Sequence, residues 1–418
     1  MDLRSLPTSL NSSDRCNERR KIIERELGAD LGALKIDPNK LGSAEENNCE
    51  QMFGHVPIPV GLAGPLKIYF NGRSGDSKIA DENATNIFLP LATTEAALVA
   101  SVNRGCKALT LSGGVTTRSI YHGMTRSLAF RIPDSGFRNF IETINKLKPE
   151  WMKIGESTSS HLKIINYYID ECDNHLFVTI NCDTDEAMGM NMVTIAAQAI
   201  GEWIEAHIPE LEFITVAGNV DSDKKPSKRT HDLGRGYEVF AEAELSEEVI
   251  KDVLHTTPYS LLTTAQAKLE SGSKVAESIG SNLQAANIIA ALYLATGQDA
   301  AHVVEGSMAD TTITDVAEDR YLPLRISVRC PAILVGVRGG GTQLPAQSQC
   351  LQLLTKPINQ LTNQPINLHL AEIIGAAVLA GEISLLAAQA THTLAKSHKS
   401  LARNSKELER PQFFKPKS

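Results

Sequence analysis

The sequence predicts an α+β protein in which a small α+β unit is inserted into a larger α/β domain. The chain has 418 residues, enough for a large core and two or three domains. One stretch follows the order helix, hairpin, helix and strand, which is typical of a compact α+β unit. Apolar segments on either side of it predict buried central helices. We expect a helical N-terminal region at 1–50, a large domain at 51–127 and 216–398, the inserted unit at 128–215, and a flexible tail at 399–418.

Composition and charge narrow the class of protein. Hydrophobic residues make up 42% of the chain and charged residues 22%, as in ordinary globular proteins. The net charge is -8 and the pI is near 5.8, so no broad basic face is expected and nucleic acid is not an expected partner. The seven cysteines are odd in number and lack a CxxC pair. This argues against a disulfide framework and against a metal site.

The sequence also bears on the compartment. The N-terminal segment lacks the continuous apolar region of a secretory signal. No run of 18 apolar residues free of charge predicts a transmembrane helix. Together with the scattered cysteines, these features predict a cytoplasmic protein without a membrane partner.

The first elements along the chain are a helix and an extended segment. Residues 14–27 form a charged, weakly amphipathic helical pattern. Residues 47–66 contain too many prolines and glycines for a regular helix. Their alternating apolar side chains favour an extended edge segment close to a ligand or another backbone. A plain loop rich in proline and glycine fits the same composition.

The next expected helix carries the first candidate catalytic residue. Thr93 or Thr94 can cap its start, and the turn at 112–114 ends it. Ala, Leu and Val fill most positions on all sides, so we expect this helix to be buried. Glu95 lies in its first turn, where a carboxylate suits the helix dipole. A buried carboxyl without a partner has a raised pKa, as a proton donor at neutral pH requires. The alternative is that Glu95 is only a helix-start charge.

The inserted unit contains a candidate phosphate-binding turn. Its expected elements are a helix at 137–147, strands at 162–169 and 175–182, a helix reaching 204, and a strand at 213–217. No G-x-G-x-x-G follows a strand. The nearest substitute is 188–191, whose backbone N–H groups could hold a pyrophosphate at the helix start, with Gly189 allowing close approach. A Met-rich helix is, however, more often part of a core.

Three further candidate residues follow in the large domain. Lys224 lies in the polar loop 218–236, where it could stabilise an oxyanion or belong to a solvated charge cluster. Asp299 follows a buried helix at 283–296 and could tune a neighbouring lysine or only cap the next helix. His398 follows a long apolar helix at 372–396, after a strand at 332–337. The negative helix end favours its protonated form, although a surface histidine near a tail fits equally.

Together these candidates form a chemically consistent set. Glu95 and His398 are two acids, Lys224 is an oxyanion stabiliser, and Asp299 is a tuning carboxylate. Such a set fits reduction of a carbonyl with a leaving thiolate.

Six motifs resemble those of 3-hydroxy-3-methylglutaryl-CoA (HMG-CoA) reductases and follow the family's order. They lie at 57–66, 92–106, 187–192, 218–226, 297–301 and 380–398, and the resemblance covers about residues 46–403. The Met-Gly-Met-Asn motif and the Asp-Lys-Lys-Pro loop resemble the first class of the family, typical of eukaryotes and archaea. The membrane anchor of animal members is missing, so the resemblance implies a soluble form.

The resemblance implies reduction of HMG-CoA to mevalonate and free CoA with two molecules of NADPH. By position, Lys224 stabilises the oxyanion of the thiohemiacetal and then polarises the aldehyde. Glu95 supplies a proton to the carbonyl oxygen at the second reduction, and Asp299 bridges Glu95 and Lys224. His398 protonates the departing CoA thiolate.

The resemblance also implies the binding residues and the assembly. The unit at 128–215 would be a ferredoxin-like NADP(H)-binding domain, and active sites would form between subunits of a homodimer or homotetramer. The expected substrate-binding residues are Arg126, Lys225, Asn287, Lys268, Ser101, Asn103 and Arg104. The expected cofactor-binding residues are Ser159, Ser160, His161, Glu186, Met188, Gly189, Met190 and Asn191.

The chain departs from the family pattern at several positions. Ser160 stands where an arginine usually contacts the 2′-phosphate of NADP, so NADH remains an alternative cofactor. Glu186 replaces an aspartate, Ala217 a serine and Gln284 a histidine. Two other readings therefore stay open: NAD-linked oxidation of mevalonate on the same fold, and a non-catalytic CoA-binding homologue.

Overall fold

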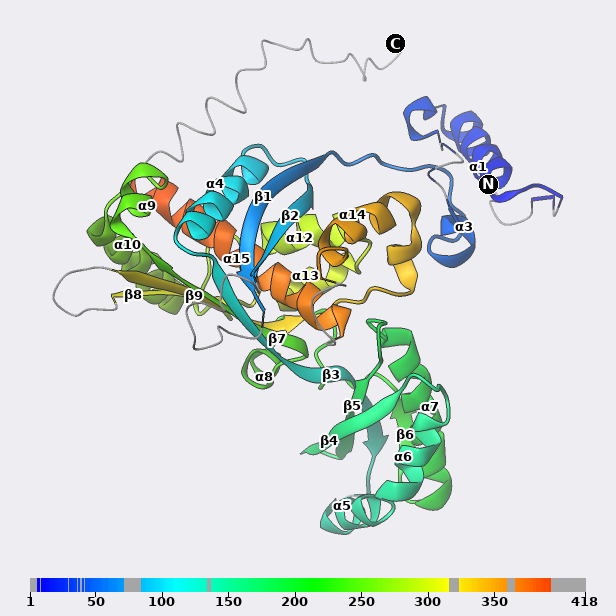
Figure 1. The fold of residues 1–418 in the computed structure, drawn as a ribbon. Coiled ribbons are helices and arrows are strands. Elements are labelled where there is room, and N and C mark those ends of the chain that lie inside the picture. Colours follow the sequence, from blue (N-terminus) through cyan, green and yellow to red (C-terminus); the bar gives the residue numbers. More distant parts are fainter. Residues whose placement is uncertain are drawn as a thin grey trace, which may run out of the picture.

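A nine-stranded sheet organises the fold in the computed structural model of the protein (Figure 1). The structure describes residues 6–391 except 8, 29, 36, 38–39, 41, 71–83, 134–136, 316–322 and 359–364. Along its main path the sheet has the order β2-β1-β3-β7-β9-β8. The strands are β1 Val60–Tyr69, β2 Ala84–Ala92, β3 Val115–Arg131, β4 Lys163–Cys172, β5 His175–Asp183, β6 Glu212–Thr215, β7 Gly236–Leu245, β8 Asp310–Asp315 and β9 Leu324–Ile333.

Strand β3 connects two parts of the molecule. Its first half, Thr116 to Gly123, pairs antiparallel with β7. Its second half, Met124 to Arg131, pairs antiparallel with β5 and partly with β6. The only parallel pair in the described sheet joins its first residues to β1. The sheet is therefore mixed, and one 17-residue strand belongs to both parts.

Three helices build the core of the larger part. They are α4 Leu98–Leu111, α12 Ala285–Thr296 and α15 Ile366–Ala390, and they pack against the sheet and one another (Figure 1). Helix α15 is the one helix among the described residues that is long and apolar enough to cross a membrane. Since 94% of its most apolar window is buried inside the protein, burial in this core accounts for its hydropathy. The sequence predicts a long apolar helix here, at 372–396, but it expects the central helix to be the one that carries Glu95.

A second core lies in the lower part of Figure 1 and contains α5 Phe137–Lys146, α6 Lys148–Glu156 and α7 Met190–His207. These helices pack with β4, β5 and β6 around Trp151, Phe130 and Ile200. The predicted order of helix, hairpin, helix and strand is confirmed, although α6 was not expected. The division of the chain into separate domains stays a prediction.

The remaining helices are short, apart from α1 Ser12–Leu27 and α14 Pro345–Thr355. Helix α1 begins after Asn11, whose side chain accepts a hydrogen bond from the Asp14 amide, and Arg19 of α1 pairs with Glu45 at 2.8 Å. The elements are α1 Ser12–Leu27, η1 Gly32–Leu34, α3 Ala44–Asn47, α8 Lys228–Leu233, α9 Glu247–Asp252, α10 Pro258–Ala265, η2 Gln266–Gly272, α11 Ser273–Ala276, η3 Ala300–His302, α13 Val303–Gly306, η4 Gly340–Gln343 and α14 Pro345–Thr355.

Two expectations about elements are wrong and one is confirmed. Helix α4 begins at Leu98, because Ala97 has φ 72° and interrupts a helix that could have started at Thr93. Glu95 therefore precedes the helix, and α4 buries one face instead of all sides. The extended segment continues into β1, where its residues up to Leu66 pair with β2 alone, because β3 joins β1 only at Ile68 and Tyr69. The expected edge position is therefore confirmed for these residues. Strand β9 ends at Ile333, so most of the strand expected at 332–337 is loop.

Gly105 gives a test of how α4 packs against α15. A Cβ atom at this position would lie 1.8 Å from the backbone oxygen of Ala380, so the two helices would have to separate. We expect Gly105→Ala to lower the free energy of unfolding by about 1–3 kcal/mol, as overpacking does, in urea denaturation. The control is Gly272→Ala, at an exposed glycine where an added Cβ would lie 3.2 Å from its nearest neighbour, the Ala267 carbonyl oxygen. Equal stability of the two variants would contradict the close helix contact.

Candidate active site

A cavity of about 930 Å³ brings together several of the predicted site residues. It lies beside the start of α7 and is closed on the other side by the segment that follows α12. Its lining includes Ser159, Met188, Gly189, Met190, Asn191, Lys224 and Asp299, together with Gly336, Arg338 and Gly339. The expected phosphate-binding turn and two of the four expected catalytic residues thus share one space.

The start of α7 has the backbone geometry of an anion site. Gly189 has φ 91°, and a Cβ there would lie 2.3 Å from the side chain of Thr184, so only glycine fits. The Thr184 hydroxyl donates to the Ala187 carbonyl at 2.9 Å and fixes the turn. The first N–H groups of an α-helix have no partner within the helix, and here they lie at the cavity wall.

Helix α12 positions Asp299 at the opposite wall. At its start, the buried Glu382 of α15 accepts hydrogen bonds from the Leu283 and Gln284 amides at 2.8 and 2.7 Å. At its end, Gly297 takes the left-handed conformation with φ 70° and ends the helix. Asp299 then caps the following turn, where Oδ1 accepts a hydrogen bond from the Ala301 amide at 3.0 Å.

Lys224 and Asp299 form an ion pair at the cavity. Lys224 Nζ lies 2.8 Å from Asp299 Oδ2, and both side chains are more than a third exposed. Burial raises the pKa of Asp299, but the hydrogen bonds from Lys224 and the Ala301 amide bring this pKa below its ordinary value. Lys224 has φ 58°, which few residues other than glycine adopt, and its amide donates to Glu305 Oε1 at 2.7 Å.

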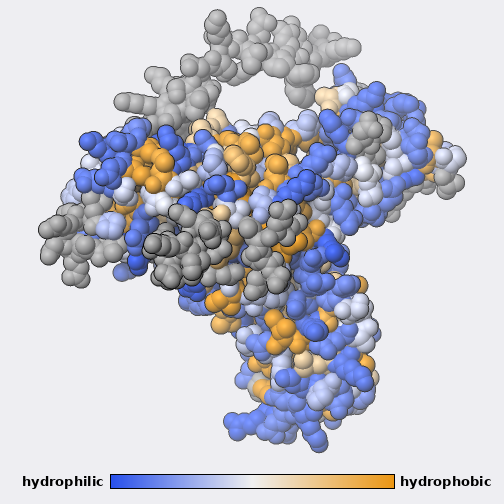
Figure 2. Space-filling model, in the orientation of Figure 1, coloured by the Kyte–Doolittle hydropathy of each residue, from blue (hydrophilic) through white to orange (hydrophobic). Residues whose placement is uncertain are grey.

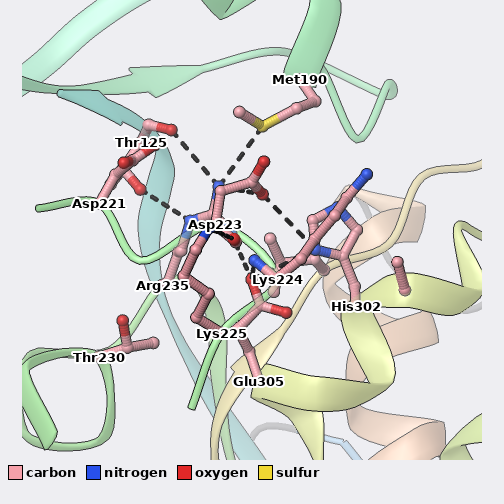
Figure 3. Close-up of polar contacts among 12 residues, drawn as sticks. Thr125, Met190, Asp221, Asp223, Lys224, Lys225, Thr230, Arg235, His302 and Glu305 are labelled. Atoms are coloured by element: carbon pink, nitrogen blue, oxygen red, sulfur yellow. Dashed lines mark hydrogen bonds and ion pairs between the residues drawn. The ribbon is translucent and has the colours of Figure 1, made fainter. Parts of the chain in front are cut away.

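A buried ion-pair network holds the loop that carries Lys224 (Figure 3). Arg235 is 1% exposed; it contacts Glu305 Oε1 at 2.6 Å and Asp223 Oδ1 at 3.1 Å, and donates to the Thr125 hydroxyl at 2.7 Å. Asp223 directly precedes Lys224 in the chain, and Glu305 accepts the Lys224 amide. One guanidinium therefore fixes the loop on both sides of the lysine.

Arg126 and Lys225 lie beside this network rather than free in the cavity. Arg126 Nη1 contacts Asp221 Oδ2 at 3.4 Å and Asp223 Oδ2 at 3.3 Å, and its Nε donates to the Thr194 hydroxyl at 2.9 Å. Burial raises the pKa of Asp221. The exposed Lys225 donates to the Asp223 carbonyl at 2.9 Å. Neither cation lines the cavity.

Other expected catalytic and substrate residues are not brought to the cavity in this chain. Glu95 is exposed, its amide donates to the Thr93 hydroxyl, and no contact among the described residues joins it to Lys224 or Asp299. The expected bridge of Asp299 between Glu95 and Lys224 is not formed among the described residues of one chain, and it stays a prediction for the assembly. The half-buried Asn287 and the exposed Lys268 do not line the cavity either. His398 lies outside the described residues.

The expected CoA-side residues hold α4 in place. Ser101 Oγ donates to the Ser384 hydroxyl at 3.0 Å, and Arg104 Nε donates to the same hydroxyl at 3.0 Å. Asn103 Oδ1 accepts a hydrogen bond from the Gly64 amide at 3.0 Å. In this structure these three side chains connect α4 to α15 and β1.

The remaining cofactor candidates divide between two places. Ser160 and His161 line a neighbouring cavity of about 320 Å³, and His161 Nδ1 lies 3.0 Å from Asp185 Oδ2. Glu186 forms an ion pair with Arg338, which lines the larger cavity. Only Ser159 and the turn 188–191 reach the cavity that holds Lys224.

The buried residues next to the Lys224–Asp299 ion pair were not predicted from the sequence. Arg235, His302 and Glu305 were not among the candidates, although all three are buried within the network. A spacing signal was present, because Asp299, His302 and Glu305 are three residues apart and share one side of a short helical segment. No spacing pointed to Arg235.

Comparisons with known proteins agree with the motifs. The family model described as "Hydroxymethylglutaryl-coenzyme A reductase" matches residues 15–403. The chain is 40% identical over 393 residues to the 3-hydroxy-3-methylglutaryl-coenzyme A reductase of Pyrococcus abyssi, covering 92% of both chains. It is 39% identical over 396 residues to that of Aeropyrum pernix, covering 94% of this chain and 90% of the relative.

The fold is similar to solved structures as well. A 3-hydroxy-3-methylglutaryl-coenzyme A reductase of Streptococcus pneumoniae has a TM-score of 0.63 at 18% identity, covering 89% of this chain and 96% of that one. A second structure from the same organism, a class II enzyme bound to NADPH, has a TM-score of 0.62 at 18% identity, covering 89% and 86%. At this identity the similarity shows the fold, a mixed α/β fold. The expected first-class form gains no support from these comparisons. The extent of the sequence matches places the chain in the hydroxymethylglutaryl-coenzyme A reductase family.

Proposed function

We propose that the protein reduces HMG-CoA to mevalonate and free CoA with two molecules of NADPH. The observation that carries this proposal is the Lys224–Asp299 ion pair, which faces the same cavity as the N–H groups at the start of α7. A cation that is partly exposed and paired with a carboxylate suits stabilisation of a developing oxyanion. The family membership of the chain supports the substrate.

The residues would act on two successive carbonyls. The nicotinamide cofactor supplies hydride when bound. At the thioester, Lys224 would stabilise the oxyanion of the thiohemiacetal, and at the aldehyde it would polarise the carbonyl. His398 would protonate the CoA thiolate that leaves between the steps, and Glu95 would protonate the alcohol oxygen formed last. In the resting site, Asp299 would hold the Lys224 ammonium in place.

The cofactor would lie with its phosphates at the start of α7. Gly189 gives the turn the left-handed conformation from which the helix starts, and Ser159 lines the same cavity. NADPH was bound in one structure with this fold. Ser160, His161 and Lys163 line the adjoining cavity, where a cation or hydroxyl could meet a 2′-phosphate. This arrangement supports NADPH, with NADH as the alternative.

The test is loss of nicotinamide absorbance with HMG-CoA, run with NADPH and NADH side by side. Oxidation of NADPH with release of one thiol per two cofactors supports the proposal. Tight HMG-CoA binding without turnover would instead indicate a non-catalytic homologue. A preference for NAD and mevalonate would indicate the oxidative direction.

The proposed substrate contacts require rearrangement. Lys225, exposed beside Lys224, would meet the HMG carboxylate, and Arg126 would do so after leaving Asp221. Asn287 and Lys268 would complete the HMG site. Ser101, Asn103 and Arg104 would line the CoA side of the assembled site.

We further propose a homo-oligomer whose active sites form between subunits. Glu95 is exposed and no contact among the described residues joins it to Asp299 within one chain, as expected if it serves a partner's site. An apolar hollow of about 550 Å³ is lined by the exposed Val56, Ile58 and Leu294. Figure 2 shows hydrophobic side chains gathered on the face around β1 and α12. Such a patch favours burial against another copy, which sedimentation would detect.

Two finer assignments stay predictions. The first-class subtype rests on the Met-Gly-Met-Asn turn at 188–191 and the Asp-Lys-Lys-Pro loop at 223–226. The cytoplasmic location without a membrane partner rests on composition and on the burial of α15.

His398 has a role that can be separated from the others. We expect His398→Gln to slow reduction of HMG-CoA about 10²–10⁴-fold, the usual contribution of a positioned acid, while sparing reduction of added mevaldehyde. The thioester step alone releases a thiolate that needs a proton. Steady-state kinetics on both substrates would measure the difference, and equal loss on both would remove the thiolate-donor role.

A further inference from the structure

His302 is a buried histidine next to the Lys224–Asp299 ion pair, and one of its ring nitrogens forms no hydrogen bond. It is fully buried, and its Nε2 has no hydrogen-bond partner. Nε2 lies 3.7 Å from Asp299 Oδ2, while Nδ1 lies 3.4 Å from Glu305 Oε1 and 4.0 Å from Asp223 Oδ1 (Figure 3). An N–H on either ring nitrogen therefore faces a carboxylate oxygen. Arg235, Lys224 and Arg126 are the cations that contact the same carboxylates.

The same oxygen of Asp299 faces two donors. Oδ2 is 2.8 Å from Lys224 Nζ and 3.7 Å from His302 Nε2. The first distance is a hydrogen bond and the second is slightly too long for one. A buried polar atom without a hydrogen-bond partner is unfavourable. A small rotation of the Asp299 carboxylate toward the ring would give His302 Nε2 such a partner.

A metal ion is a poor explanation of this cluster. The ligand atoms of Asp223, His302 and Glu305 lie within 4.8 Å of one another, a spacing that could hold a cation. Arg235, however, already contacts Asp223 and Glu305. A second cation between the same carboxylates would lie against the guanidinium, which electrostatics opposes.

We propose that His302 is a positioning residue that takes over Asp299 as a hydrogen-bond donor when Lys224 turns toward the substrate carbonyl. This inference rests on the proposed function and adds one step to it: the Lys224 ammonium, held by Asp299 Oδ2 in the resting site, turns toward the oxyanion. Without a second donor, Asp299 Oδ2 would lose its partner, and this loss would hold the lysine back. His302 lowers this resistance, so Lys224 can alternate between carboxylate and substrate.

A nitrogen NMR experiment tests the hydrogen bond without relying on activity. In protein labelled with ¹⁵N-histidine, His302 is identified by loss of its signal in His302→Gln. We expect Lys224→Met to shift the His302 Nε2 signal to the hydrogen-bonded position, because His302 is then the one side-chain donor near Asp299 Oδ2 among the described residues. The control is Lys228→Met, an exposed lysine that pairs with Asp232 at 2.7 Å. An unchanged Nε2 signal in Lys224→Met would overturn the inference, whether or not the protein is a reductase.

Kinetics of two variants distinguish hydrogen-bond donation by the His302 side chain from its contribution to packing. Glutamine keeps an N–H donor, whereas leucine keeps only volume. We expect His302→Leu to lower kcat by about tenfold or more, the effect of one hydrogen bond to a charged group, with KM for HMG-CoA little changed. His302→Gln should recover most of kcat. Equal kcat in the two folded variants would overturn the role, and a leucine variant that fails to fold leaves the NMR result decisive.

The matched control is another buried histidine. His369 is 1% exposed and lies 3.3 Å from Glu372, three residues along, but it does not line the cavity. We expect His369→Gln to leave kcat and the His302 signal unchanged. If the wild-type protein shows no reduction of HMG-CoA, the proposed function fails while the NMR comparison still decides the inference.

Discussion

Replacing Lys224 by methionine is expected to lower kcat/KM for HMG-CoA by at least about 10²–10³-fold, as removal of an oxyanion donor does. The loss should be similar for added mevaldehyde, because both steps place negative charge on an oxygen near the ammonium. Methionine keeps most of the side-chain volume but removes the charge that pairs with Asp299 at 2.8 Å. Steady-state kinetics with both substrates measures the effect.

A neighbouring lysine provides the control for this result. Lys228 is exposed and pairs only with the exposed Asp232 among the described contacts of its side chain. We expect Lys228→Met to keep kcat/KM within about threefold, as for most surface changes. Binding of HMG-CoA by the Lys224 variant should persist. A Lys224 variant with wild-type rates on either substrate would contradict the oxyanion role for that step.

Replacing Arg235 by methionine is expected to lower the free energy of unfolding by about 3–5 kcal/mol, because removing one partner of a buried pair leaves charge uncompensated. The change leaves Glu305, which is fully buried, and Asp223 without their shared cation. Since both residues hold the Lys224 loop, reductase activity should fall as well. Urea denaturation measures the first effect and the absorbance assay the second.

The matched control is an exposed pair. Arg325 lies 3.0 Å from Glu244, and both side chains are 49% exposed. We expect Arg325→Met to change the free energy of unfolding by no more than about 1 kcal/mol, as for surface ion pairs. Similar stability losses in the two variants would contradict the importance of the buried network.

The sequence predicted the parts of the site that are local in the chain. The turn at 188–191 and the loop around Lys224 are contiguous segments with recognisable residue types, and the structure brings both to one cavity. Arg235 could not be predicted in this way. Its partners Asp223, Glu305 and Thr125 lie 12, 70 and 110 residues away, and no periodic pattern encodes such pairings.

The error at Glu95 has a different cause. Composition predicted an all-round apolar helix from Thr93, but a single left-handed residue, Ala97, moves the helix start to Leu98. The conformation of one alanine is set by tertiary context, which propensity does not contain. The buried central helix exists, but it is α15, and the catalytic candidate does not lie on it.

Strand β3 has a consequence for how the molecule comes apart. After Gly123 the pairing partner of β3 changes from β7 to β5, while β3 itself continues as one strand. Its backbone hydrogen bonds therefore belong to the sheets of both hydrophobic cores. Loss of either core would expose half of that strand and weaken the other half. The two cores should therefore melt in one cooperative transition, and amide exchange along 116–131 should report a single global opening.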